Sequence, residues 1–303
     1  MEELFAHSLL VVTGKGGVGK STVAAALGLA ASRRGLRTIV VEVTAREDVS
    51  RALAREQTSV YTELAVSERL HHISIDPQRA MEEYLSEQLP VGVLAARFSR
   101  NRIFTGLTAA TPGLRELLTI GKVWELAQHE RRTRGAETYD LVVLDAPATG
   151  QALAMLQAPR TFASVARVGP VAKQGRAVAS FLGDPQRTAV LAVSTAEEMP
   201  VGETLELRSR LREDLGMDLS LVVVNAVLAH RFSDRDQRTL RTAPPSPAQH
   251  AALFMASWAH RQRMQIARLQ QGLQAVALVT LPFMFQSALD REALELLSRE
   301  LAP

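Results

Sequence analysis

The chain has 303 residues, of which 47% are hydrophobic and 22% charged, so it is globular and long enough for one large α/β domain or two small ones. Its net charge is only +3, and the pI of 9.6 reflects a basic side made mostly of arginine, so the pI is a weak indication of nucleic-acid binding. Cysteine is absent, which excludes disulfides, thiolate zinc sites, iron–sulfur clusters and a cysteine nucleophile.

No apolar run is long enough to span a membrane, and the acidic N-terminus lacks the basic-then-apolar plan of a secretory signal. We therefore expect a cytoplasmic protein without direct membrane insertion.

Runs rich in Val, Ile and Leu alternate with helical patterns along almost the whole chain. Their uninterrupted apolar character predicts parallel strands that are buried on both faces. The alternation predicts an α/β fold, doubly wound, with a mostly parallel sheet of about seven strands. No linker or repeat divides the chain, so we expect a single domain over 1–303. The predicted strands lie at 9–13, 38–43, 72–75, 141–145, 190–194, 219–224 and 275–281.

A glycine-rich segment, GKGGVGKST, follows the first predicted strand and matches the P-loop pattern G-x-x-x-x-G-K-[ST]. Its backbone N–H groups can form an anion nest, and a helix beginning at Lys20 adds the positive end of its dipole. We expect Lys20 to reach the β- and γ-phosphates of ATP and Ser21 to ligate Mg²⁺. The predicted nucleotide-binding residues here are Gly14, Lys15, Gly16, Gly17, Val18, Gly19, Lys20, Ser21 and Thr22.

The second lysine of this segment, Lys15, directly follows the first glycine. This feature resembles the deviant Walker A P-loop ATPases, in which the extra lysine crosses a dimer interface to the partner's nucleotide. The resemblance implies a nucleotide-sandwich dimer. The alternative is an ordinary solvated loop lysine.

The strand at 141–145 ends in Asp145, the Walker B arrangement, whose carboxylate is placed to hold Mg²⁺ through water. The segment that begins at this aspartate, DAPATGQAL, resembles switch II of the arsenite-pump and tail-anchored-protein-targeting ATPases. Further similar segments extend the resemblance from about residue 9 to 297: they lie at 70–85, 112–126, 193–207, 220–228 and 279–285.

This family resemblance implies four more nucleotide contacts. Gly150 is expected to sense the γ-phosphate, and Asn225 to read the adenine. Glu197 falls at a nucleotide-contacting position, and Pro282 lies beside the base.

At switch I the family has an aspartate that positions the attacking water, and this chain has Thr44 there. A threonine is not a general base at neutral pH, so ATP hydrolysis is expected to be slow or absent unless Glu42, Glu47 or Asp48 substitutes. Glu42 would point to the same strand face as Thr44. A structural or Mg²⁺-shell acid is an equally good interpretation of Glu42. The candidate catalytic residues are Lys15, Lys20, Glu42, Thr44 and Asp145.

The predicted partners follow from what the chain lacks. Without cysteine it has no zinc clamp and no metalloid site of the kind the family uses. Its single P-loop implies a homodimer or a heterodimer with a paralogue. The segment 160–188 is short and lacks methionine, which argues against a tail-anchored client. We nevertheless expect a helical client-type region at roughly 77–133 and 151–188.

Two further features are interpreted as structural. His71 and His72 point to opposite faces of a strand and cannot chelate one metal, so they are predicted to be ordinary residues at the edge of the core. The basic segment 231–241 is diluted by aspartates and is predicted to be a solvated loop that binds no nucleic acid.

The sequence as a whole predicts a dimeric, Mg-ATP-binding ATPase that couples its nucleotide state to an unknown protein client. The alternative is a switch that does not hydrolyse ATP, or the inactive half of a heterodimer.

Overall fold

The computed structural model describes residues 2–43, 48–53, 60–88, 111–132, 135–165, 169–286 and 290–301. Thr44 and Glu47, two of the residues considered for switch I, lie outside the described residues.

One sheet runs through the described part of the chain, with the strand order β3-β4-β2-β5-β1-β6-β7-β8. All neighbouring strands are parallel except the β3–β4 pair, which is antiparallel. The predicted α/β fold with a mostly parallel sheet is thus confirmed. The strands are β1 (Leu9–Gly14), β2 (Thr38–Glu42), β3 (Leu64–Ala65), β4 (Leu70–Ser74), β5 (Leu141–Ala148), β6 (Thr188–Thr195), β7 (Leu219–Val227) and β8 (Ala277–Pro282).

The prediction of about seven strands was one short of the described eight. The additional strand, β3, has only two residues and pairs with the edge of β4. Two residues give no recognisable hydrophobic run, so the sequence carries no signal for this strand.

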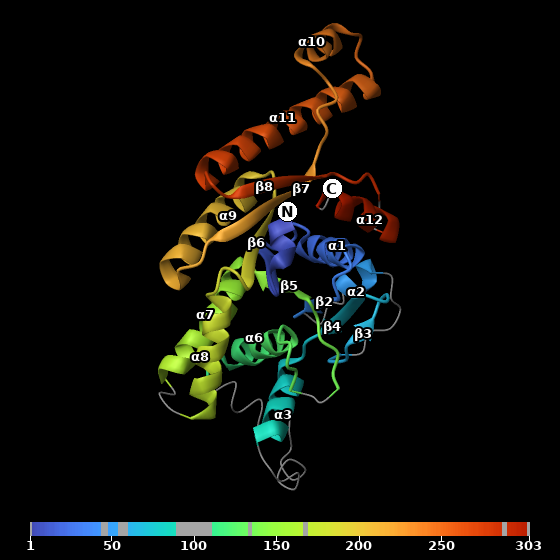
Figure 1. The fold of residues 1–303 in the computed structure, drawn as a ribbon. Helices are drawn as coiled ribbons and strands as arrows, with labels where there is room; N and C mark the ends of the chain where they lie inside the picture. The colour runs from blue at the N-terminus through green and yellow to red at the C-terminus, as the bar shows by residue number, and fades with distance from the viewer. Residues whose placement is uncertain are drawn as a thin grey trace.

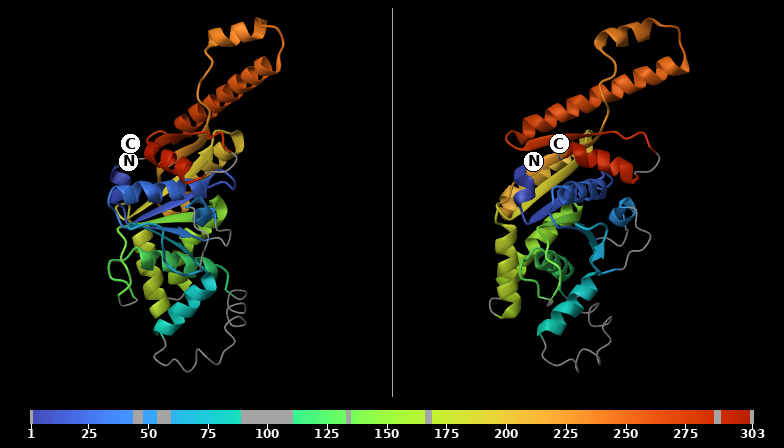
Figure 2. Two further views of the ribbon diagram at one scale, coloured as in Figure 1. Left: turned by 90° about the vertical axis from the view of Figure 1, so that its right-hand side faces the viewer. Right: turned by 45° about the vertical axis from the view of Figure 1, so that its right-hand side comes forward.

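Helices cover both faces of the sheet (Figures 1 and 2). One face packs on α1 (Lys20–Arg33), α2 (Asp48–Ala52), α12 (Arg291–Glu300) and the short 3₁₀ helix Glu2–Ala6. The other packs on α6 (Leu114–Leu126), α7 (Thr149–Val165), α8 (Pro170–Leu182), α9 (Glu198–Arg210), the π-helical turn Leu211–Leu215 and α11 (Pro247–Leu273). α3 (Pro77–Gln88) packs against α6.

Successive residues of β1 show why these strands are apolar throughout. Leu9 and Val11 belong to the core on the α6 side, whereas Leu10 and Val12 belong to the core on the α1 side. Because a strand points alternate side chains to opposite faces, a strand covered on both sides needs apolar residues at every position.

A helical arm extends from the carboxyl end of β7 (Figure 2). It contains α10 (Asp234–Thr242), which has no buried residue, and the first turns of α11, whose buried residues begin at Ala256. The prediction of a loop at 231–241 was therefore wrong for most of the segment. Ser233 and Asp236 form a reciprocal capping box that starts α10, while the predicted solvation of the segment is confirmed.

No described helix combines the length and the apolar character that crossing a membrane requires.

The packing of α1 on β2 makes a prediction about Gly28. A Cβ atom at Gly28 would lie 2.4 Å from Val40 Cγ2, so Gly28→Ala should lower the free energy of unfolding by about 1–3 kcal/mol through overpacking. The matched control is Gly121→Ala in α6, where the nearest atom to the new Cβ would be 3.9 Å away, and it should be neutral or stabilising. Urea denaturation of both variants measures the difference, and equal stabilities would contradict the packing.

Candidate functional site

Three glycines of the loop between β1 and α1 have backbone angles that residues with a side chain rarely adopt. Gly14, Gly17 and Gly19 have φ values of +145°, +85° and +93°. A Cβ at Gly14 would lie 2.1 Å from the Val193 carbonyl oxygen, and one at Gly19 would lie 2.3 Å from Asn225 Nδ2. This loop conformation therefore requires glycine at these three positions.

The loop meets β5 at the start of α1. The Ser21 hydroxyl donates a 2.6 Å hydrogen bond to Asp145 Oδ2, and Asp145 is 6% exposed. The two oxygen-bearing residues predicted for Mg²⁺ are thus adjacent, although 124 positions separate them. Hydroxyl and carboxylate oxygens are the donors that Mg²⁺ prefers, so this pair fits the ion.

Lys20 points back over the loop, where its Nζ donates a 3.0 Å hydrogen bond to the Lys15 carbonyl oxygen. Burial lowers the pKa of Lys20, and the nearby charge of Asp145 opposes this shift. A partly desolvated ammonium group beside a nest of backbone N–H groups attracts anions more strongly than one in water.

Lys15 forms an ion pair with Glu203, which lies on α9 of the same chain. Both side chains are partly exposed, at 29% and 35%. Sequence reasoning missed Glu203, because nothing in the local sequence indicates which helix packs beside the loop.

Glu42 is the last residue of β2 and is completely buried. Its Cα is paired with Asp145 on one neighbouring strand and with Ser74 on the other. Its Oε2 lies 3.4 Å from His72 Nε2, and His72 is 3% exposed. The structure therefore places Glu42 at the candidate site, beside Asp145.

The remaining predicted contacts lie at the carboxyl edge of the sheet. Asn225 in β7 donates a 3.0 Å hydrogen bond from Nδ2 to the Val18 carbonyl oxygen, which joins it to the loop. Pro282 ends the neighbouring strand β8. Glu197 is exposed immediately before α9, and Gly150 is exposed in the first turn of α7 with open space around it. The structure brings Asn225 to the loop, and leaves the roles of the other three as predictions.

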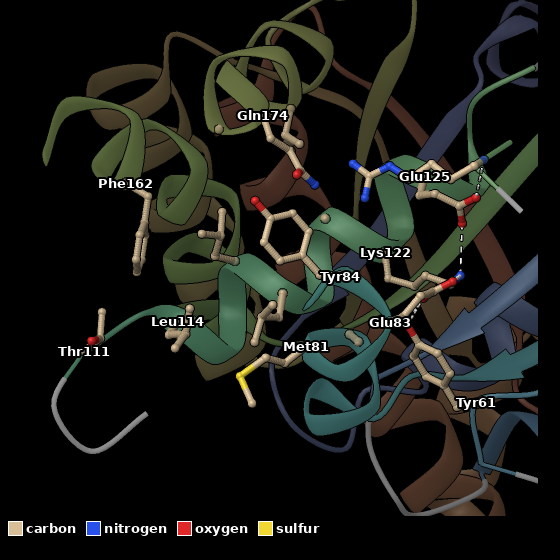
Figure 3. A pocket seen from close by; sticks show the side chains of 17 residues that line it. Tyr61, Met81, Glu83, Tyr84, Thr111, Leu114, Lys122, Glu125, Phe162 and Gln174 are labelled. Atoms are coloured by element: carbon tan, nitrogen blue, oxygen red, sulfur yellow. Dashed lines mark hydrogen bonds and ion pairs between the residues drawn. The ribbon is translucent and has the colours of Figure 1, made fainter. Parts of the chain in front are cut away.

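A separate pocket of about 340 Å³ lies between α3, α6, α7 and α8 (Figure 3). Its walls are mainly apolar and come from both ranges of the expected client-type region. Toward one end, Figure 3 shows the Tyr84 hydroxyl and the Gln174 amide facing each other. The apolar residues include Met81, Leu114, Leu117, Leu118, Phe162 and Val178.

Charged side chains beside this pocket are paired with one another. Lys122 Nζ lies 2.8 Å from Glu83 Oε1 and 3.1 Å from Glu125 Oε2, and Glu125 Oε1 accepts from Arg131 at 2.7 Å. Burial alone would raise the pKa of Glu125, but the hydrogen bond from Arg131 and the charge of Lys122 outweigh it, so the pKa lies below its usual range. The pocket therefore offers apolar surface bordered by charges that are already neutralised.

Comparison with known proteins gives a consistent result. The model of the anion-transporting ATPase family matches residues 7–168 and 165–302. The chain is similar to the ATPase BagA of Mycobacterium tuberculosis, with 33% identity over 233 residues that cover 75% of this chain and 67% of the relative.

More distant relatives carry the name arsenical pump-driving ATPase. The one from Acidiphilium multivorum is 24% identical over 298 residues, covering 90% of this chain and 46% of the relative. The one from Escherichia coli is 24% identical over 292 residues, covering 88% and 44%. The matched part of each pump ATPase is therefore less than half of its length.

Proposed function

We propose that this chain, which belongs to the anion-transporting ATPase family and is a nucleotide-binding ATPase, works as a Mg²⁺-dependent dimer that couples ATP hydrolysis to binding of a protein client. The observation that carries the proposal is the hydrogen bond between Ser21 and Asp145, which joins the glycine-rich loop to the carboxyl end of β5. Those two residues would hold Mg²⁺, which when bound offsets the negative charge of the phosphates.

The residues of the loop have distinct parts in this proposal. The amides of 14–19 cradle the phosphates at the start of α1, and Lys20 adds a positive charge to the same place. Asn225 holds the loop from the side of β7 and presents its amide toward the base. Glu197 and Pro282 line the same edge, and Gly150 senses the γ-phosphate at the start of α7.

Lys15 acts in trans in this proposal. In the single chain it is paired with Glu203, so it must leave that carboxylate before it can reach the nucleotide of a second copy or of a paralogue. Its charge would then stabilise negative charge that develops on the transferred phosphoryl group, as an arginine finger does.

The apolar pocket supports the client part of the proposal. Helix α7 follows β5 without an intervening loop and carries both Gly150, beside the candidate site, and Phe162, in the pocket wall. A helix rises about 1.5 Å per residue, so Gly150 and Phe162 lie roughly 18 Å apart along α7, which links the two places although Pro159 interrupts its hydrogen bonding between them. The occupant we propose is an apolar side chain of the client protein, because the charges bordering the pocket are already paired.

The alternative function remains a nucleotide switch or an inactive half of a heterodimer. It is favoured by Thr44, which stands where the family has its switch I aspartate. ATP binding without turnover would identify it.

The phosphate role proposed for Lys20 can be tested by substitution. Lys20→Ala should weaken binding of Mg-ATP by roughly 10- to 100-fold, since a hydrogen bond to a charged group is worth about 1.5–3 kcal/mol. Isothermal titration calorimetry with a non-hydrolysable ATP analogue measures this. Lys173→Ala in α8, a lysine outside the loop, is the control and should bind like the wild type. Intact binding in Lys20→Ala would refute the phosphate role of the loop.

The role in trans proposed for Lys15 can be tested together with its partner Glu203. ATP turnover by the wild type should rise faster than linearly with protein concentration. The variant Lys15→Ala should lose ATP turnover but retain ATP binding. Glu203→Gln frees Lys15 and should raise turnover at low protein concentration by up to about fivefold, because a partly exposed ion pair is worth at most about 1 kcal/mol. The control Glu206→Gln changes an exposed carboxylate on the same helix and should have no effect. Linear turnover in all variants would count against a dimer.

The client site proposed at the pocket can be tested with an apolar probe. The fluorescent dye anilinonaphthalene sulfonate should bind the wild-type protein with an affinity that depends on the nucleotide present. Gly121→Leu, which places a side chain in the pocket, should reduce dye binding severalfold. Gly202→Leu on α9 makes the same substitution outside the pocket and serves as the control. Equal dye binding by the two variants would show that the pocket is not the apolar site.

A further inference from the structure

A pair of buried side chains beside the candidate Mg²⁺ site bears on how Glu42 works. Glu42 and Asp145 occupy paired positions on adjacent parallel strands, so their side chains leave the same face of the sheet. That face packs on α1, which carries Ser21 at its start. The exposed fractions of Glu42 and Asp145 are 0% and 6%.

Two carboxylates in this arrangement repel each other. Like charges at directly opposed positions destabilise a sheet, and burial makes each charge more costly. Positive charge or hydrogen-bond donors that face such a pair offset this cost. Lys20 provides positive charge beside Asp145, because the charge of Asp145 raises the pKa of Lys20. A different residue faces Glu42.

That residue is His72 in β4. Its Cα pairs with Val40, two residues before Glu42 on β2, so His72 stands diagonally beside Glu42 on the same face. The Nε2 atom lies 3.4 Å from Glu42 Oε2. The preceding residue, His71, faces the other side of the sheet, where its Nε2 lies 2.9 Å from Glu137 Oε2 and its ring contacts Tyr139.

We propose that His72 is a positioning residue, which fixes the Glu42 carboxylate beside Asp145 so that Glu42 acts on the Mg²⁺ site as an outer acid and not as the base that activates water. The inference rests on the proposed Mg-ATP function. It chooses between the two interpretations that the sequence left equal for Glu42.

The burial of Glu42 favours the outer role. Glu42 has no exposed surface, whereas a general base must reach the attacking water. Mg²⁺ keeps several waters when it binds beside phosphates, and an acid one shell further out orients those waters. Loss of such an outer partner typically lowers metal affinity 10- to 100-fold.

The test measures metal binding directly. Mn²⁺ replaces Mg²⁺ as a paramagnetic probe, and its affinity for the full chain loaded with a non-hydrolysable ATP analogue is measured by electron paramagnetic resonance. His72→Leu and Glu42→Gln should weaken Mn²⁺ binding about tenfold or more. His72→Gln keeps a side-chain donor and should restore much of the affinity. His71→Leu makes the same change one position away on the opposite face and should leave the affinity unchanged.

Thermal unfolding of each nucleotide-free variant and nucleotide affinity in EDTA complete the experiment. If His72 only supported the fold, His72→Leu would lower stability without a selective loss of Mn²⁺ affinity, and this result would overturn the inference. If His72→Leu does not fold, the Mn²⁺ affinity and the thermal stability of Glu42→Gln and His72→Gln are compared with those of His71→Gln. A loss of stability without a selective loss of Mn²⁺ affinity would again overturn the inference. Failure of the wild type to bind Mn²⁺ with nucleotide would instead refute the proposed function itself.

Discussion

The hydrogen bond between Ser21 and Asp145 is the contact on which the candidate site depends. It exists because β1 and β5 run side by side in parallel, with Val12 opposite Asp145, so that the helix leaving β1 and the end of β5 meet at one edge of the sheet. The neighbouring strand β2 also contributes to the site, since its register with β5 places Glu42 opposite Asp145. On the other side of β1, β6 crowds Gly14 with the carbonyl oxygen of Val193. The loop conformation and the acidic pair are thus consequences of strand order.

Most of the fold was predictable because its signals are local. A strand buried on both faces is apolar at every position, and the seven longer strands were found from that pattern. The glycine-rich loop was equally predictable, since its positive φ angles need glycine whatever surrounds them. Short or weakly patterned elements were missed. The strand β3 has two residues, and α10 has a strong capping box but no buried face, so it resembled a loop.

The parts of the site that were not predictable depend on tertiary contacts. Glu203 is one of several acids on α9, and only the packing of that helix beside the loop selects it as the partner of Lys15. His72 was interpreted as an ordinary core residue, because a sequence shows that neighbouring residues face opposite ways but not which carboxylate each one meets. The effect of Thr44 on ATP hydrolysis stays a prediction, since that residue lies outside the described part of the chain.

Buried charged side chains have different surroundings in two parts of this molecule: the cluster beside the pocket and the acidic pair at the glycine-rich loop. Beside the pocket, Glu125 lies between Lys122 and Arg131, and its pKa is lowered because their hydrogen bonds and charges exceed the cost of burial. Such a cluster is already compensated and gains little from an added ion. At the loop, Glu42 and Asp145 share one face, where Lys20, the Ser21 hydroxyl and the imidazole of His72 lie beside them. Carboxylate oxygens gathered at one place are the ligands that a hydrated divalent cation prefers. In the proposed function, a metal–nucleotide complex bound at the end of β5 would therefore bring positive charge beside this acidic pair.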